Sequence, residues 1–118
     1  MALFLPADGL PRIATPRTGK AFTLAELQAF VGGYIEAVYI EVSVHSVDRR
    51  LGLFVEMPER LIMFVNEQGL LDDLPFNLDA TRLAQPFIMA GSWIVGDAII
   101  CTYEEAGEIP PEHGRAAV

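Results

Sequence analysis

The sequence predicts an α+β fold: a single, mostly antiparallel sheet of about four to six strands with two helices packed on it. Residues 21–36, AFTLAELQAFVGGYIE, carry both a start signal and a stop signal for a helix. Elsewhere, short runs of β-branched and aromatic residues alternate with Gly, Pro, Asn and Asp, as is typical of strands joined by turns. The chain of 118 residues is long enough to bury a core without disulfide bonds or metal.

The first helix is predicted to begin after Thr23, its N-cap. Glu26 completes a capping box, in which each side chain accepts a hydrogen bond from a backbone N–H of the first turn. Gly32-Gly33 ends the helix, because glycine adopts the left-handed conformation without a steric penalty. One helix face is mostly apolar and is expected to pack on the sheet: Leu24, Leu27, Gln28 and Val31.

The middle of the chain is predicted to form three strands. Residues 34–47 alternate between two faces and read as one long strand. Residues 48–50 form a charged turn, and residues 51–57 form the second strand of a hairpin. Residues 60–65 are an apolar run of strand length, followed by the turn sequence of residues 66–69.

The C-terminal half is predicted to contain one short helix and two strands. Residues 70–71 start a short return strand, and Asn77 caps a helix over residues 78–84. Residues 98–103 are apolar throughout, so this last strand is expected to be central and buried. Cys101 within it is expected to behave as a small buried hydrophobic residue.

We expect one domain with two flanking segments. Residues 1–19 are predicted as an N-terminal extension, rich in Pro and Gly, with residues 4–5 as a candidate short strand. Residues 20–104 form the α+β domain, and residues 105–118 form an acidic flexible tail.

Composition and charge exclude several classes of partner. The net charge of −8 repels nucleic acid and anionic membrane surfaces, so we expect neither as a partner. No apolar run approaches the ~20 residues of a membrane span, and the N-terminus lacks a signal peptide's basic start. We therefore expect a cytoplasmic protein. The hydrophobic fraction of 52% leaves apolar surface to bury between subunits, which favours a homo-oligomer, with an ordinary compact monomer as the alternative.

No group of residues in the sequence has the pattern of a catalytic or metal site. His45 and His113 have no partner at the spacing that metal binding or base catalysis needs. The adjacent carboxylates at residues 72–73 and 104–105 point to different sides of an extended chain. We therefore expect no enzymatic activity, no metal and no cofactor.

Polar residues next to glycines at element ends are the candidates for a ligand-binding site. Glycine allows a ligand or another backbone to approach closely. The candidates lie at the helix–strand junction, at the turn containing Gly69, around the short helix and before the last strand: Gly32, Gly33, Tyr34, Glu36, Asn66, Asn77, Arg82 and Asp97. The alternative is that each glycine serves its turn and each Asn serves its cap.

Several segments, in this order, carry a family resemblance: FTLAELQAFVGGYIE, MFVNEQGLLDDLPFN, Ala80-Thr81 and IVGDAII. Together they resemble a small phage-associated family, domain of unknown function 3846, over residues 20–103. The resemblance implies a phage or mobile-element origin and an accessory role in the host cytoplasm. It implies no known activity.

Three functional hypotheses follow. The first is a non-catalytic counter-defence factor that binds and sequesters a small nucleotide-like ligand, with Arg82 as the expected phosphate contact. The alternative is an acidic inhibitor that docks on a basic surface of a host defence protein, as the net charge of −8 suggests. The third is an enzyme that uses Glu36 or Asp97.

Overall fold

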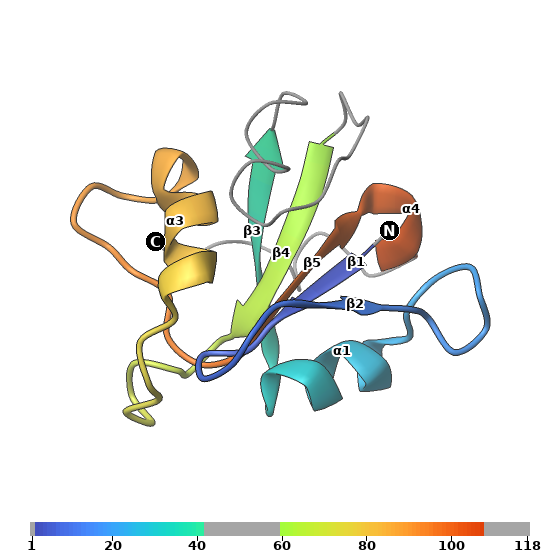
Figure 1. Cartoon of the computed structure of the whole chain (residues 1–118), viewed down its shortest axis with the longest axis horizontal. Coiled ribbons are helices and arrows are strands. Elements are labelled where there is room, and N and C mark those ends of the chain that lie inside the picture. Colours follow the sequence, from blue (N-terminus) through green and yellow to red (C-terminus); the bar gives the residue numbers. More distant parts are fainter. Residues whose placement is uncertain (1, 42–59, 108–118) are drawn as a thin grey trace.

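The computed structural model describes residues 2–41 and 60–107. Within these ranges, five strands form one sheet in the order β2-β1-β5-β4-β3, and every neighbouring pair is antiparallel (Figure 1). The strands are β1 (Ala2–Leu5), β2 (Arg12–Ala14), β3 (Ile35–Glu41), β4 (Arg60–Asn66) and β5 (Ala98–Thr102). The predicted α+β class is confirmed, and β5 lies at the centre of the sheet, as expected.

The helices pack on both faces of this sheet. They are α1 (Leu24–Val31), α3 (Leu78–Ala84), the 3₁₀ helix η1 (Gln85–Phe87) and α4 (Tyr103–Ala106). Figure 1 shows α1 and α3 on opposite sides of the strands. Both predicted helices are present, and each covers a different face.

Each face of the sheet has its own apolar core, because side chains alternate along the strands. One core, under α1 and α4, includes Leu27, Ile35, Ala37 and Phe64. The other, under α3, includes Val38, Met63, Val65, Leu83 and Ile94. Strand β3 therefore contributes neighbouring residues to two separate cores.

The capping box of α1 forms as predicted. Thr23 Oγ1 accepts a hydrogen bond from the backbone N–H of Glu26 at 3.1 Å, and Glu26 Oε1 accepts one from the backbone N–H of Thr23 at 2.8 Å. Gly32 ends the helix with a φ of 78°, a left-handed conformation that favours glycine.

Residues 2–14 contribute two strands to the sheet, although residues 1–19 are predicted as an extension. Strand β1 pairs with β5 and with β2, and its four residues are all buried. Strand β1 is therefore part of the domain's core, and β2 is a mostly exposed edge strand of the sheet. The candidate short strand at residues 4–5 is real and two residues longer.

Other differences from the prediction concern turns and the C-terminus. Residues 70–71 start no strand, since residues 67–73 form successive turns. The predicted start of the tail, at residue 105, falls inside α4, whose capping box pairs Thr102 with Glu105. The second strand of the predicted hairpin, the end of its first strand, both histidines and residues 108–118 lie outside the described ranges. Within those ranges, no helix is long and apolar enough to cross a membrane.

Candidate functional site

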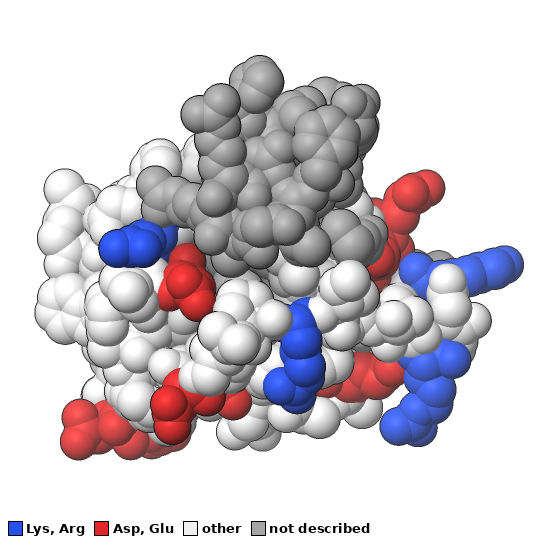
Figure 2. Space-filling model, in the orientation of Figure 1, with Lys and Arg blue, Asp and Glu red and all other residues white. Residues whose placement is uncertain are grey.

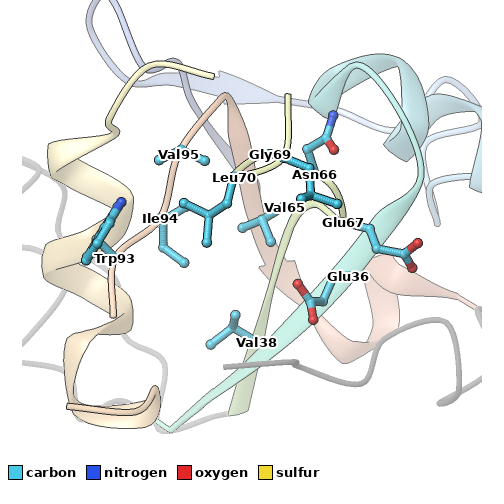
Figure 3. Close-up of a pocket in the computed structure, with 11 residues that line it drawn as sticks. Glu36, Val38, Val65, Asn66, Glu67, Gly69, Leu70, Trp93, Ile94 and Val95 are labelled. Atoms are coloured by element: carbon cyan, nitrogen blue, oxygen red, sulfur yellow. The ribbon is translucent and has the colours of Figure 1, made fainter. Parts of the chain in front are cut away.

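A pocket of about 330 Å³ opens beside α3, at one end of β3 and β4. Its walls come from the two strands, from the turns after β4 and from the segment leading to β5 (Figure 3). They are mostly apolar: Val38, Val65, Leu70, Leu71, Trp93, Ile94 and Val95. The polar or small lining residues are Glu36, Asn66, Glu67 and Gly69. We call this cavity the Glu36 pocket.

Glu36 is the unusual residue of this pocket. The alternation of β3 places it on the same face as Val38 and opposite Val65 on β4, both of which are buried. Only 9% of Glu36 is exposed. A carboxylate is rarely placed among apolar side chains unless it has partners or a function, because burial disfavours its charge.

The two acidic side chains of the pocket differ in direction. Figure 3 shows the Glu36 carboxylate turned toward the space that Ile94 and Trp93 border from the other side. The Glu67 carboxylate points outward, and its residue is exposed. Glu36 therefore offers hydrogen-bond acceptors to a ligand in the pocket, while Glu67 adds negative charge at its edge.

Asn66 shapes the pocket through its amide rather than facing a ligand. Its Nδ2 donates to the carbonyl oxygen of Val31 at 3.1 Å, and its Oδ1 accepts from the N–H of Gln68 at 2.8 Å. These bonds join the end of α1 to the turn after β4. Gly33 packs against this amide, since a Cβ there would stand 2.9 Å from Asn66 Nδ2.

Gly69 lets the turn approach the opposite wall. A Cβ at this position would lie 2.8 Å from Val95 Cγ2 and 3.3 Å from the Val95 carbonyl oxygen. Any larger residue would push the turn away from the segment before β5. Gly69 is therefore needed for the close contact that encloses this end of the pocket.

Asn77 and Thr81 hold the other wall in place. Asn77 Oδ1 caps α3 by accepting from the N–H of Ala80, and its Nδ2 donates to the carbonyl oxygens of Leu5 and Gly96 at 2.8 Å each. Thr81 Oγ1 accepts from the N–H of Ile94 at 2.8 Å. Asn77 is 1% exposed and its amide is used within the fold, so it supports the pocket and does not line it.

The remaining sequence candidates lie away from the pocket lining. Gly32 caps α1, and Tyr34 is largely exposed. Asp97 Oδ1 accepts a hydrogen bond from the backbone N–H of Ala7 at 2.9 Å. Arg82 is exposed on α3. The structure thus brings Glu36, Asn66 and Gly69 together, with Gly33 behind them, and leaves the other candidates elsewhere.

Trp93 and Glu67 also line the pocket but were not among the sequence candidates. Trp93 stands in a segment without regular structure, and its neighbour Ile94 is tied to Thr81, thirteen residues away. Such a contact has no local pattern in the sequence. The burial of Glu36 does have one, because alternation along the predicted strand already groups it with Val38 and Ile40.

A second cavity of about 420 Å³ lies over α1, lined by Arg17, Thr23, Ala25, Glu26, Ala29 and Phe30. Its carboxylate is already used, since Glu26 accepts from the backbone N–H groups of Thr23 and Arg17 at 2.8 Å each. These two bonds hold the pKa of Glu26 below its usual value of 4.5. The carboxylate that lines this cavity therefore serves the helix cap.

Cys101 lies in the core, where its surroundings oppose ionisation of the thiol. Cys101 is fully buried, as predicted, and burial raises the pKa of its thiol to about 12. In the described part of the chain, no three His, Cys, Asp or Glu side chains are grouped so that they could hold a metal ion.

Comparison with known proteins places the chain in a family. The family model described as "Domain of unknown function (DUF3846)" matches residues 2–114, a longer stretch than the resemblance over residues 20–103. No curated protein and no solved structure matches the chain. The match includes β1 and β2, in agreement with their place in the sheet. The chain therefore belongs to the family of domain of unknown function DUF3846.

Proposed function

We propose that this protein is a non-catalytic binding protein that holds a small ligand in the Glu36 pocket. The observation that carries the proposal is a buried carboxylate turned into an apolar cavity of about 330 Å³. Small-molecule sites are typically concave and mostly apolar, with a few polar groups that orient the ligand, and range from about 300 to 1,000 Å³. The pocket fits a small molecule or one part of a larger one.

Sequestration is the activity that suits this site. A protein that binds a signal molecule stoichiometrically removes it from solution without chemistry, which is how a counter-defence factor of a phage or mobile element would act. If the ligand is nucleotide-like, its base is the part that fits, because apolar walls and Trp93 match a flat ring. The described lining contains no Lys or Arg to hold a phosphate, and Arg82 lies outside it.

Native mass spectrometry tests the proposal. The protein is measured alone and with a panel of cyclic and linear nucleotides, nucleosides and small amines. We expect a discrete added mass per subunit that is released unchanged on denaturation, and the same spectra report whether the protein is the homo-oligomer that we expect. Leu70→Trp, which places a larger side chain at an exposed position of the pocket lining, should abolish the added mass, whereas Ala29→Trp at the exposed cavity over α1 should not. Release of a chemically altered ligand would contradict a non-catalytic role.

The second candidate function is an acidic inhibitor that docks on a basic protein. The observation in its favour is that most of the exposed large apolar side chains of the described residues fall in the segment that contains α3: Leu70, Leu71, Phe76, Leu78, Phe87, Met89 and Trp93. In Figure 2 the left side of the molecule, which carries α3, is mostly uncharged apart from one basic and one acidic group, and further acidic side chains lie at its lower edge. A steep loss of partner binding with added salt would distinguish this function from ligand sequestration.

A further inference from the structure

We propose that the Glu36 pocket selects an organic cation: a protonated amine or guanidinium joined to a flat apolar group. This inference rests on the proposed function and names the ligand class of the same site. It starts from the polar groups that the pocket presents, which are unlike those of a phosphate-binding site.

The charged side chains of the described lining are both acidic. Glu36 and Glu67 line the pocket, and no Lys or Arg does. A carboxylate is a hydrogen-bond acceptor only, so the complementary ligand group is an N–H donor, and a positively charged donor adds Coulombic attraction. An anionic group would meet two like charges and the field of a chain with a net charge of −8.

The burial of Glu36 strengthens this attraction. Its residue is 9% exposed and its cross-strand neighbour Val65 is 5% exposed, so water screens the carboxylate weakly on that side. Glu36 also makes an interaction within the protein. Since its two carboxylate oxygens provide about four acceptor sites, it is able to keep such an interaction and accept a hydrogen bond from a ligand.

The opposite wall fits the apolar part of such a ligand. Trp93 is 49% exposed, and together with Ile94 and Leu70 it forms the apolar side of the pocket across from the carboxylate. An indole or phenyl ring would lie against these side chains while its ammonium group reaches Glu36. Trp93 is also the aromatic residue that attracts cations most strongly through its ring face.

Three ligands of nearly equal shape test this inference on the full-length protein: tryptamine, which is cationic, tryptophol, which is neutral, and indole-3-acetate, which is anionic. By isothermal titration calorimetry we expect tryptamine to bind at least ~10-fold more tightly than tryptophol, as a charge-assisted hydrogen bond implies. Indole-3-acetate should bind most weakly. Equal affinity for tryptamine and tryptophol, or tighter binding of the anion, would overturn the inference.

Two variants that each remove one negative charge test whether the preference for tryptamine arises in the pocket. Glu36→Gln keeps the side-chain shape and should reduce the preference for tryptamine over tryptophol to within ~2-fold, because the charged acceptor is lost. Asp72→Asn removes one negative charge from an exposed turn outside the lining and should leave that preference unchanged. If both variants lower it equally, the overall charge of the protein and not the pocket is responsible, and the inference fails. Glu67→Gln provides a second test in the pocket, with a smaller expected loss because its carboxylate is exposed.

The outcomes separate this inference from the proposed function. Tight binding of a nucleotide or nucleoside in the pocket without any preference for cations would overturn the inference and support sequestration. Absence of binding by every nucleotide, nucleoside, amine and indole compound would overturn both.

Discussion

The two faces of the sheet use the same strands for different purposes. Beneath α1 the core is closed and apolar, with an aromatic cluster in which the ring of Phe30 lies 5.2 Å from that of Phe4 and 5.9 Å from that of Phe22. Beneath α3 the face contains the buried polar residues Asn77 and Thr81, the buried carboxylate of Glu36, and the pocket. In β3, Ile35 and Ala37 serve the first face, while Glu36 and Val38 serve the second.

The difference arises from what covers each face. Helix α1 closes its side with an apolar face fixed by a complete capping box. Helix α3 is almost as long as α1 but covers only part of its face, and an irregular segment held by side chain–backbone hydrogen bonds covers the rest. Irregular segments pack less continuously than helices, so space is left beside Glu36. We infer that the α1 face provides stability and that the α3 face provides binding.

The largest expected effect is on the closed face. Phe64 is 1% exposed in the core under α1, so Phe64→Ala should lower the free energy of unfolding by about 3–5 kcal/mol through lost burial and a new cavity. Urea unfolding followed by circular dichroism measures this change. A loss below about 1 kcal/mol would mean that the face is not close-packed.

Removing the N-cap of α1 or of α3 compares the stability of the two faces directly. Asn77→Ala removes the α3 cap and leaves the buried carbonyls of Leu5 and Gly96 without their donor, so we expect a loss of about 2–3 kcal/mol. Thr23→Ala removes only the exposed cap of α1 and should cost about 1 kcal/mol. Urea unfolding of both variants tests this order. Equal losses would show that the two additional bonds of Asn77 contribute little.

Acidity should weaken the cap of α1 in a predictable direction. The pKa of Glu26 is lowered in the folded protein by hydrogen bonds from the backbone N–H groups of Thr23 and Arg17. Its charged form therefore stabilises the fold above the ordinary pKa of 4.5, and this contribution is lost as the pH falls through the lower folded-state pKa. The stability difference between the wild type and Glu26→Gln should shrink on acidification. A difference that is constant with pH would contradict the shifted pKa.

The smallest expected effect concerns Cys101, whose thiol faces the closed side. Burial raises its pKa to about 12, so hardly any thiolate exists near neutral pH and alkylation of the native protein should be very slow. Iodoacetamide labelling followed by mass spectrometry should show rapid reaction only in denaturant. Rapid labelling without denaturant would show that the α1 face opens readily.

The sequence patterns correctly predicted those helices and strands that depend on interactions between residues close together in the sequence. The Thr23–Glu26 capping box, the Asn77 cap and the apolar run of β5 were all readable, and all three are present. Thr102 and Glu105 have the same capping-box spacing, and this pattern indicates a helix at α4, where the sequence analysis expects a flexible tail. Charged residues had favoured a flexible tail at that position.

The parts of the site that depend on contacts between residues far apart in the sequence could not be predicted. The sequence near Trp93 contains no sign that Gly69 approaches Val95, or that Thr81 fixes Ile94. Asn77 illustrates the reverse case, because its type suggested a ligand contact while its two amide donors bind the backbone on either side. The predicted site and the observed site therefore differ most at polar side chains, such as Asn77, whose hydrogen bonds hold the tertiary structure together.

The most direct test of the account is a ¹⁵N–¹H NMR titration of the full-length protein with tryptamine. We predict shifts at the Trp93 indole N–H and the Gly69 backbone amide, which belong to the Glu36 pocket, and none at Ala29 or Phe30 in the cavity over α1. Shifts confined to α1, or no shifts at saturating ligand, would contradict the assignment of binding to the α3 face.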